Sequence, residues 1–179
     1  MKILGISGSL RHDSYNTMLL RNVPVELELW DGLREIPPYD EDDDIEPAPQ
    51  AVARMRAAVS GADAILFATP EYNASVPGQL KNAVDWLSRP RGEAALRNKP
   101  VAVIGTSTGA FGAVWAQAEL RKVLATAGAR VVDAETAVGH APEKFDAEGV
   151  LLDENLKEQL HEVAAALTAE VPSPMPVAA

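Results

Sequence analysis

The chain contains no cysteine among its 179 residues. This absence excludes disulfide bonds, thiolate nucleophiles, iron–sulfur clusters and cysteine-bound zinc, so any redox chemistry needs a bound cofactor. Long hydrophobic runs are also absent, because no stretch approaches the roughly 20 apolar residues that a membrane helix requires. The sequence enters an apolar run at once, without a basic region or a cleavage signal. We therefore expect a cytoplasmic protein with no membrane partner.

Positive charge is scarce as well. The 16 Lys and Arg residues face 26 Asp and Glu, which gives a formal net charge of −10. An acidic chain repels phosphate-rich polymers, so nucleic acid is not an expected partner. The length suits one domain, which we place at residues 1–170. The proline-rich tail, residues 171–179, is predicted to be disordered.

Five apolar runs have the character of β-strands. Three of them are nearly continuous in β-forming residues, as expected of strands that are covered on both faces. The second run instead alternates apolar and acidic residues, which predicts a strand at the edge of the sheet. The runs are Lys2–Ser7, Val25–Trp30, Asp63–Thr69, Pro100–Thr106 and Ala129–Asp133.

Helical patterns lie between these strands. Apolar residues recur on one stripe in residues 52–59, 80–87, 116–127 and 156–167. Regular alternation of strand and helix predicts right-handed crossovers and one parallel α/β sheet of about five strands. In such sheets, ligands bind at loops that leave the carboxyl ends of the strands.

The loop after the first strand, Gly8–Asn16 (GSLRHDSYN), has the composition of a phosphate cradle. Small residues let backbone amides approach an anion, and a helix begins at the end of the loop. Walker-type glycine spacing and GxGxxG are both absent, so a phosphomonoester is the expected ligand. The alternative is an ordinary capped turn. Candidate ligands are Ser9, Arg11, Ser14 and Asn16.

The loop after the third strand, Thr69–Asn82, presents Glu71, Tyr72 and Asn73 at its rim. An aromatic side chain beside amide and carboxylate groups suits a flat heteroaromatic ring that needs stacking and edge hydrogen bonds. The alternative is that Tyr72 only packs the loop.

The loop after the fourth strand, Gly105–Gly112 (GTSTGAFG), offers backbone amides for the opposite edge of such a ring. It also matches the G-x-S-x-G pattern of α/β-hydrolases, with Ser107 as nucleophile. That alternative requires a downstream acid and histidine, which Asp133 with His140 or His161 would supply in the right order.

The acidic run Asp40–Asp44 alternates like the start of a calcium-binding loop. Ile45 stands where such a loop needs glycine, and Ala51 where it needs glutamate. We therefore predict a solvated acidic loop and no metal site.

Taken together, GSLRHDSYN, PEYNASVPGQLKNAVDW and the Gly/Ser-rich third loop resemble the NADPH-dependent FMN reductase family, which includes quinone, azo-dye and chromate reductases. The resemblance extends from Met1 to about Leu167. It implies a flavodoxin-like three-layer sandwich with a five-stranded parallel sheet in the order 2-1-3-4-5. The first helix can run only from about Ser14 to Asn22, whereas family members usually have a longer helix there.

The resemblance also implies the cofactor site. No side chain is expected to act as a catalytic acid or base, because the flavin performs the chemistry. The residues expected to hold the FMN phosphate are Ser9, Arg11, Ser14 and Asn16. Those expected to border the isoalloxazine are Pro70, Glu71, Tyr72 and Asn73, with Ser107, Thr108 and Gly109 on its opposite side.

The activity implied is hydride transfer from NADPH or NADH to FMN, followed by transfer of two electrons to a small acceptor. Quinones, azo compounds, chromate and free flavin are the acceptors considered. A homodimer or homotetramer with the flavin near the subunit interface is implied as well. The alternatives are an FMN electron carrier that does not turn over nicotinamide, and a related module without flavin.

Overall fold

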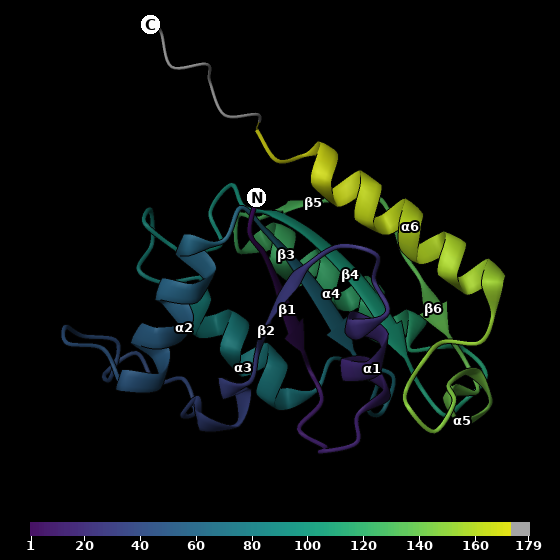
Figure 1. Ribbon diagram of the computed structural model, residues 1–179. Coiled ribbons are helices and arrows are strands. Elements are labelled where there is room, and N and C mark those ends of the chain that lie inside the picture. Colours follow the sequence, from purple (N-terminus) through teal and green to yellow (C-terminus); the bar gives the residue numbers. More distant parts are fainter. Residues whose placement is uncertain (173–179) are drawn as a thin grey trace, which may run out of the picture.

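The computed structural model describes residues 1–172 (Figure 1). The sheet order is β2 (Leu27–Trp30), β1 (Ile3–Ser7), β3 (Ala64–Thr69), β4 (Pro100–Thr106) and β5 (Arg130–Val131). All neighbouring strands are parallel. Both the predicted strand order and the predicted parallel pairing are therefore confirmed. Of the tail predicted to be disordered, residues 173–179 lie outside the described part of the chain.

Burial explains this order. Every residue of β3 and β4 is buried, as continuous apolar strands require. The alternating strand β2 lies at the edge and leaves Glu28 exposed, as its pattern predicts.

The fifth position of the sheet differs from the prediction of one strand over residues 129–133. Two short strands pair with successive parts of β4: β5 with Pro100 and Val101, and β6 (Ala137–Val138) with Gly105 and Thr106. The polar segment Asp133–Glu135 lies between them, and the ladder resumes when Gly105 N donates to Thr136 O (3.0 Å). The sheet therefore has six strands in five positions.

Helices cover both faces of the sheet and complete the three layers. On one face, the apolar stripes of α2 (Gln50–Gly61), α3 (Gly78–Leu87) and α4 (Val114–Thr126) pack against strand residues such as Phe67. On the other face lie α1 (Tyr15–Arg21) and α6 (Glu154–Ala169). The remaining elements are the 3₁₀ turn η1 (Gly32–Glu35) and α5 (Ala141–Lys144).

Helix α1 is as short as the sequence predicts. The hydroxyl of Ser14 caps it by accepting from Thr17 N (3.4 Å), and Asn22 ends it. The Asn22 side chain then joins the distant 149–151 segment, donating to Gly149 O (2.8 Å) and accepting from Leu151 N (2.8 Å). The helix end is thus fixed by long-range hydrogen bonds instead of by further turns.

Candidate functional site

Three loops follow the carboxyl ends of the adjacent strands β1, β3 and β4. Ser7 is paired with Ala68 across β1 and β3, and Thr69 with Gly105 across β3 and β4. Gly8 N continues the first pairing by donating to Ala68 O (2.8 Å). The loops that follow β1, β3 and β4, called here the first, second and third loops, therefore begin side by side.

The first loop places Ser9 and Arg11 on the wall of a cavity of about 340 Å³, between the loop, α1 and the end of β2. Arg11 is exposed and forms no ion pair within residues 1–172; its Nη2 donates to Asp13 O (3.4 Å). A guanidinium without a carboxylate partner is free to bind a phosphate in bidentate fashion.

Asn16 has a different environment, because it is 3% exposed and its amide faces β4. Its Nδ2 donates to Thr106 O (3.0 Å), and its Oδ1 accepts from Thr106 N (3.0 Å). Both polar atoms of the side chain are therefore engaged in joining α1 to the start of the third loop. Ser14 is buried too, with its hydroxyl at the helix cap.

The second loop contains a tight turn at Asn73 and Ala74. Tyr72 and Ser75 exchange both main-chain hydrogen bonds (3.2 and 3.1 Å), while Asn73 and Ala74 have φ of 54° and 57°. Two successive left-handed residues are the signature of a type I′ turn. The turn lifts Tyr72 to the surface, where its side chain is 52% exposed.

Helix α4 holds this turn at several points. Ala116 N donates to Glu71 Oε2 (3.0 Å), while Glu119 Oε2 accepts from Ser75 Oγ (2.6 Å) and Val76 N (3.2 Å). The hydrogen bond from Ser75, followed by that from Val76, lowers the pKa of Glu119 below its ordinary value. The sequence did not identify Glu119, because its partners lie more than 40 residues away.

A cavity of about 560 Å³ connects the first and second loops. Gly8, Leu10 and Arg11 line one side, and Tyr72 with residues 77–79 lines the other. Arg34 also lines it and donates through Nη2 to Leu10 O (2.5 Å). Arg34 was not among the residues predicted from the sequence, since nothing in its local pattern marks it.

The third loop is fastened to residues 138–141 and lines neither of these cavities. Ser107 N donates to Val138 O (3.1 Å), and His140 N donates to Gly109 O (2.9 Å). Thr108 and Gly109 are exposed. Ser107 Oγ donates to Gly109 O (3.3 Å), and no imidazole in the described chain is hydrogen-bonded to it. This geometry gives no support to the hydrolase alternative.

Two exposed aromatic side chains lie where the third loop passes into α4. Phe111 is 64% exposed and Trp115 is 49% exposed, and their ring centroids are 5.0 Å apart in an edge-on arrangement. The sequence reasoning missed this pair, because an isolated aromatic residue in a loop does not reveal its exposure.

The acidic run lies away from these loops. Asp44 Oδ1 accepts from Arg56 Nη2 (2.8 Å), and Asp40 Oδ1 accepts from Asp42 N (3.0 Å). Two of the three alternating carboxylates are thus engaged with the protein itself.

Comparison with known proteins identifies the family. The model of the family described as NADPH-dependent FMN reductase matches residues 1–143. An NAD(P)H-dependent FMN reductase of Pseudomonas aeruginosa is 44% identical over 174 residues, which cover 93% of each chain. An NADPH:quinone oxidoreductase of Arabidopsis thaliana is 38% identical, covering 94% of this chain and 91% of its own.

Solved structures show the same relationship. The flavoenzyme NAD(P)H:(acceptor) oxidoreductase FerB of Paracoccus denitrificans superposes with a TM-score of 0.84 at 33% identity, covering 94% of this chain and 98% of its own. A flavodoxin of Pseudomonas aeruginosa superposes with a TM-score of 0.58 at 17% identity, a likeness of fold alone.

The sheet order and its two helical layers define a flavodoxin-like α/β protein. The chain belongs to the NADPH-dependent FMN reductase family. It is an NAD(P)H-dependent oxidoreductase of the quinone-reductase type, with FMN as its cofactor. No helix within residues 1–172 is long and apolar enough to span a membrane.

Proposed function

We propose that the first and second loops hold FMN across the 560 Å³ cavity and that the chain passes electrons from NADPH or NADH to a small acceptor. The observation that carries this proposal is the shared wall of that cavity, with the cation of Arg11, which forms no ion pair within residues 1–172, on one loop and the exposed ring of Tyr72 on the other. This arrangement fits a ligand with a phosphate at one end and a flat ring at the other.

The phosphate would be bound by Arg11 and the hydroxyl of Ser9. The main-chain N–H groups of Ser14 and Asn16, at the start of α1, would complete the proposed phosphate site. Because both polar atoms of the Asn16 side chain already bond to Thr106, we assign that side chain the task of fixing the loop.

The ring would lie against the second loop, and the third loop, which lines neither cavity, would border the part of the ring that extends beyond the 560 Å³ cavity. Bound FMN would supply the redox chemistry, taking a hydride from the reduced nicotinamide and giving two electrons to the acceptor. The protein's part is to orient the reactants at stacking distance and to exclude competing acceptors. The residues proposed to border the ring are Pro70, Glu71, Tyr72, Asn73, Ser107, Thr108 and Gly109.

A homodimer or homotetramer is part of the proposal. Phe111, in the third loop, and Trp115, in α4, form an exposed aromatic patch. Exposed aromatic residues that cluster on a surface are typical of protein interfaces. A neighbouring subunit on this patch would also close the open side of the flavin site.

Quinones are the first acceptors that we propose, because several relatives are named quinone reductases. One of them, a 2-hydroxy-1,4-benzoquinone reductase of a Burkholderia species, is 36% identical and covers 89% of this chain. Azo compounds, chromate and free flavin are proposed as secondary acceptors that fit the same open site. We place the reaction in the cytoplasm, as the sequence suggests.

The test is an anaerobic stopped-flow titration of the FMN-loaded protein with NADPH and with NADH, followed by the four acceptor classes. We expect rapid bleaching of the flavin by at least one nicotinamide and fastest reoxidation by quinones. If neither nicotinamide bleaches the flavin, the chain is an electron carrier and the proposal is wrong.

The phosphate assignment has its own test in Arg11→Ala. This variant should bind FMN at least tenfold more weakly and riboflavin nearly normally, because a charge-assisted contact is lost only where a phosphate exists. Arg54→Ala is the matched control, since Arg54 is paired with Glu35 and lines neither cavity. Fluorescence titration with both ligands measures the difference, and equal losses would show that Arg11 is structural.

A further inference from the structure

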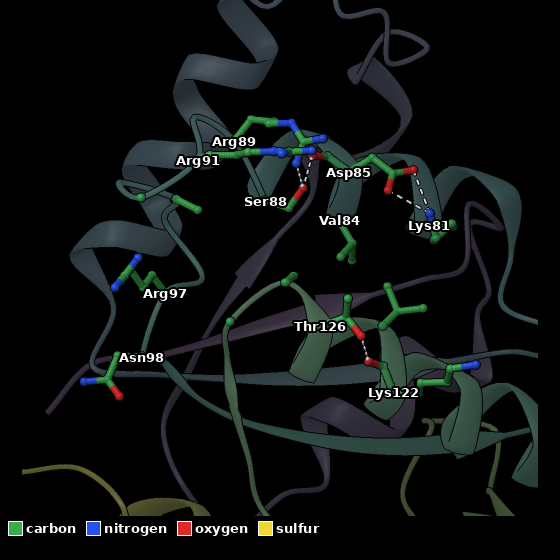
Figure 2. Close-up of a pocket in the computed structure, with 15 residues that line it drawn as sticks. Lys81, Val84, Asp85, Ser88, Arg89, Arg91, Arg97, Asn98, Lys122 and Thr126 are labelled. Atoms are coloured by element: carbon green, nitrogen blue, oxygen red, sulfur yellow. Dashed lines mark hydrogen bonds and ion pairs between the residues drawn. The ribbon is translucent and has the colours of Figure 1, made fainter.

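A third cavity, of about 960 Å³, lies between α3 and α4 (Figure 2). Its walls come from the second half of α3, the segment 88–98 and the last turns of α4. These helices run antiparallel to the strands that they cover, so their carboxyl ends lie where the strands begin. The cavity therefore lies at the amino ends of the strands, whereas the three loops lie at their carboxyl ends.

The cavity wall is strongly cationic, although the chain is acidic. Five basic residues line it, against the single carboxylate of Asp85. That carboxylate is already paired, because Lys81 Nζ contacts its two oxygens at 2.7 and 2.9 Å. The basic residues that remain are Arg89, Arg91, Arg97 and Lys122.

Cations that form no ion pair within residues 1–172 are concentrated at this cavity and at one other. Within residues 1–172, eight of the 16 Lys and Arg side chains form ion pairs with carboxylates. Of the other eight, Arg11, Arg21 and Arg34 line the 340 Å³ cavity beside the first loop. Four line the cavity between α3 and α4, and Lys99 donates to main-chain carbonyls. Unpaired cations thus gather at two cavities.

The cationic side chains around the cavity come from three segments. In Figure 2, Arg89 and Arg91 follow the end of α3, Arg97 lies across the cavity from them, and Lys122 projects from α4. The guanidinium of Arg89 is held 5.9 Å above the ring of Tyr39. Arg91 and Arg97 lie outside both helices, so compensation of a helix dipole does not account for them.

The floor between these cations is apolar. Val84 is buried and projects into the cavity between the two helices, while Val123 and Ala127 are half-buried. A volume of 960 Å³ lies at the upper end of the range of about 300–1,000 Å³ for small-molecule sites. The cavity is thus large enough for a ligand with an apolar or aromatic body as well as an anionic group.

We propose that this cavity binds a nucleotide, with its phosphates held by arginines of the segment 88–98 and its base over the apolar floor. Four cations that form no ion pair within residues 1–172 repel one another, so an anion with several charges is favoured over a single carboxylate. Guanidinium groups match phosphate oxygens in bidentate geometry. The site is separate from the proposed flavin site, and the proposal does not depend on that site.

The experiment is calorimetric titration of the FMN-loaded protein with ADP and with inorganic pyrophosphate, at low ionic strength. Saturating FMN keeps the nucleotide from the first loop. We expect saturable ADP binding, with pyrophosphate at least tenfold weaker because it lacks the base. Equal affinities would overturn the nucleotide assignment, and absence of ADP binding below about 1 mM would overturn the site.

Variants localise the binding. Arg91→Gln with Arg97→Gln should weaken ADP binding by roughly tenfold per arginine, since each charge-assisted contact is lost. Neither side chain makes a hydrogen bond within the described chain, so the variant should fold. The matched control is Lys2→Gln with Lys157→Gln, which removes the same charge from exposed surface pairs. An equal loss in the control would show that only the net charge matters and would overturn the proposal.

Discussion

Replacing Asn16 by Ala tests whether the first and third loops are built as one unit. The substitution removes two buried hydrogen bonds to Thr106 and leaves its N–H and C=O without these partners. Losing bonds of this kind, with the desolvation cost of the groups left behind, destabilises a protein by about 2–4 kcal/mol. For a chain of this size, each kcal/mol lowers Tm by about 2–4 °C, so Tm should fall by roughly 4–16 °C.

Ligand binding separates this structural role from direct phosphate contact. If Asn16 acts through Thr106, Asn16→Ala should weaken FMN and riboflavin by the same factor, in contrast to Arg11→Ala. Thermal unfolding of the apoprotein and fluorescence titration with both flavins give the two readouts. A fall in Tm below about 2 °C would refute the energetic reasoning, and a selective loss of FMN would show that Asn16 contacts the phosphate.

Three further predictions concern the other loops. Tyr72→Phe should slow flavin reduction by roughly tenfold or less in rapid-reaction measurements, because no proton transfer from Tyr72 is required; tenfold corresponds to about 1.4 kcal/mol. Tyr72→Ala should slow reduction further. Glu119→Gln should lower Tm at pH 7. Because the pKa of Glu119 is depressed in the folded state, the stability that it contributes is present above its unfolded pKa of about 4.3 and is lost as the pH falls through the folded value. Phe111→Ser with Trp115→Ser should shift the protein to smaller species in light scattering.

Each of these predictions has an opposing outcome. Complete loss of reduction in Tyr72→Phe with normal FMN affinity would assign its hydroxyl a chemical role. A Tm difference between wild type and Glu119→Gln that does not begin to shrink as the pH falls below about 4.3 would show that the carboxylate charge is not the cause. An unchanged molecular mass in the aromatic double variant would place the subunit interface elsewhere.

The strand order was implied by the family resemblance, whereas local pattern indicated how the individual strands are buried. Continuous apolar residues mark β3 and β4 as central, and the acidic alternation of β2 marks it as an edge. The short α1 was also visible, since Ser14 and the approach of β2 limit it on both sides. The division of the last position into β5 and β6 was not, because a two-residue strand such as Ala137–Val138 carries no periodicity.

The sequence indicated which loops form the candidate site, but not the hydrogen bonds that fix their geometry. Their composition indicated a phosphate and a ring, while the task of Asn16 depends on a partner 90 residues away. The same holds for the hydrogen bonds of Glu119 to Ser75 and Val76. Long-range hydrogen bonds between a side chain and the main chain leave no periodic trace in a sequence.

The attachment of the second loop to α4 has a consequence for how acceptor preference changes in evolution. Glu71, Ser75 and Val76 are all fastened to one or two turns of that helix. A substitution at an exposed position such as Glu119 alters what anchors the turn that carries Tyr72, without changing a residue on the cavity wall. Divergence among duplicated genes can therefore proceed through a helix position outside the cavity wall, while the loop sequence itself is inherited unchanged.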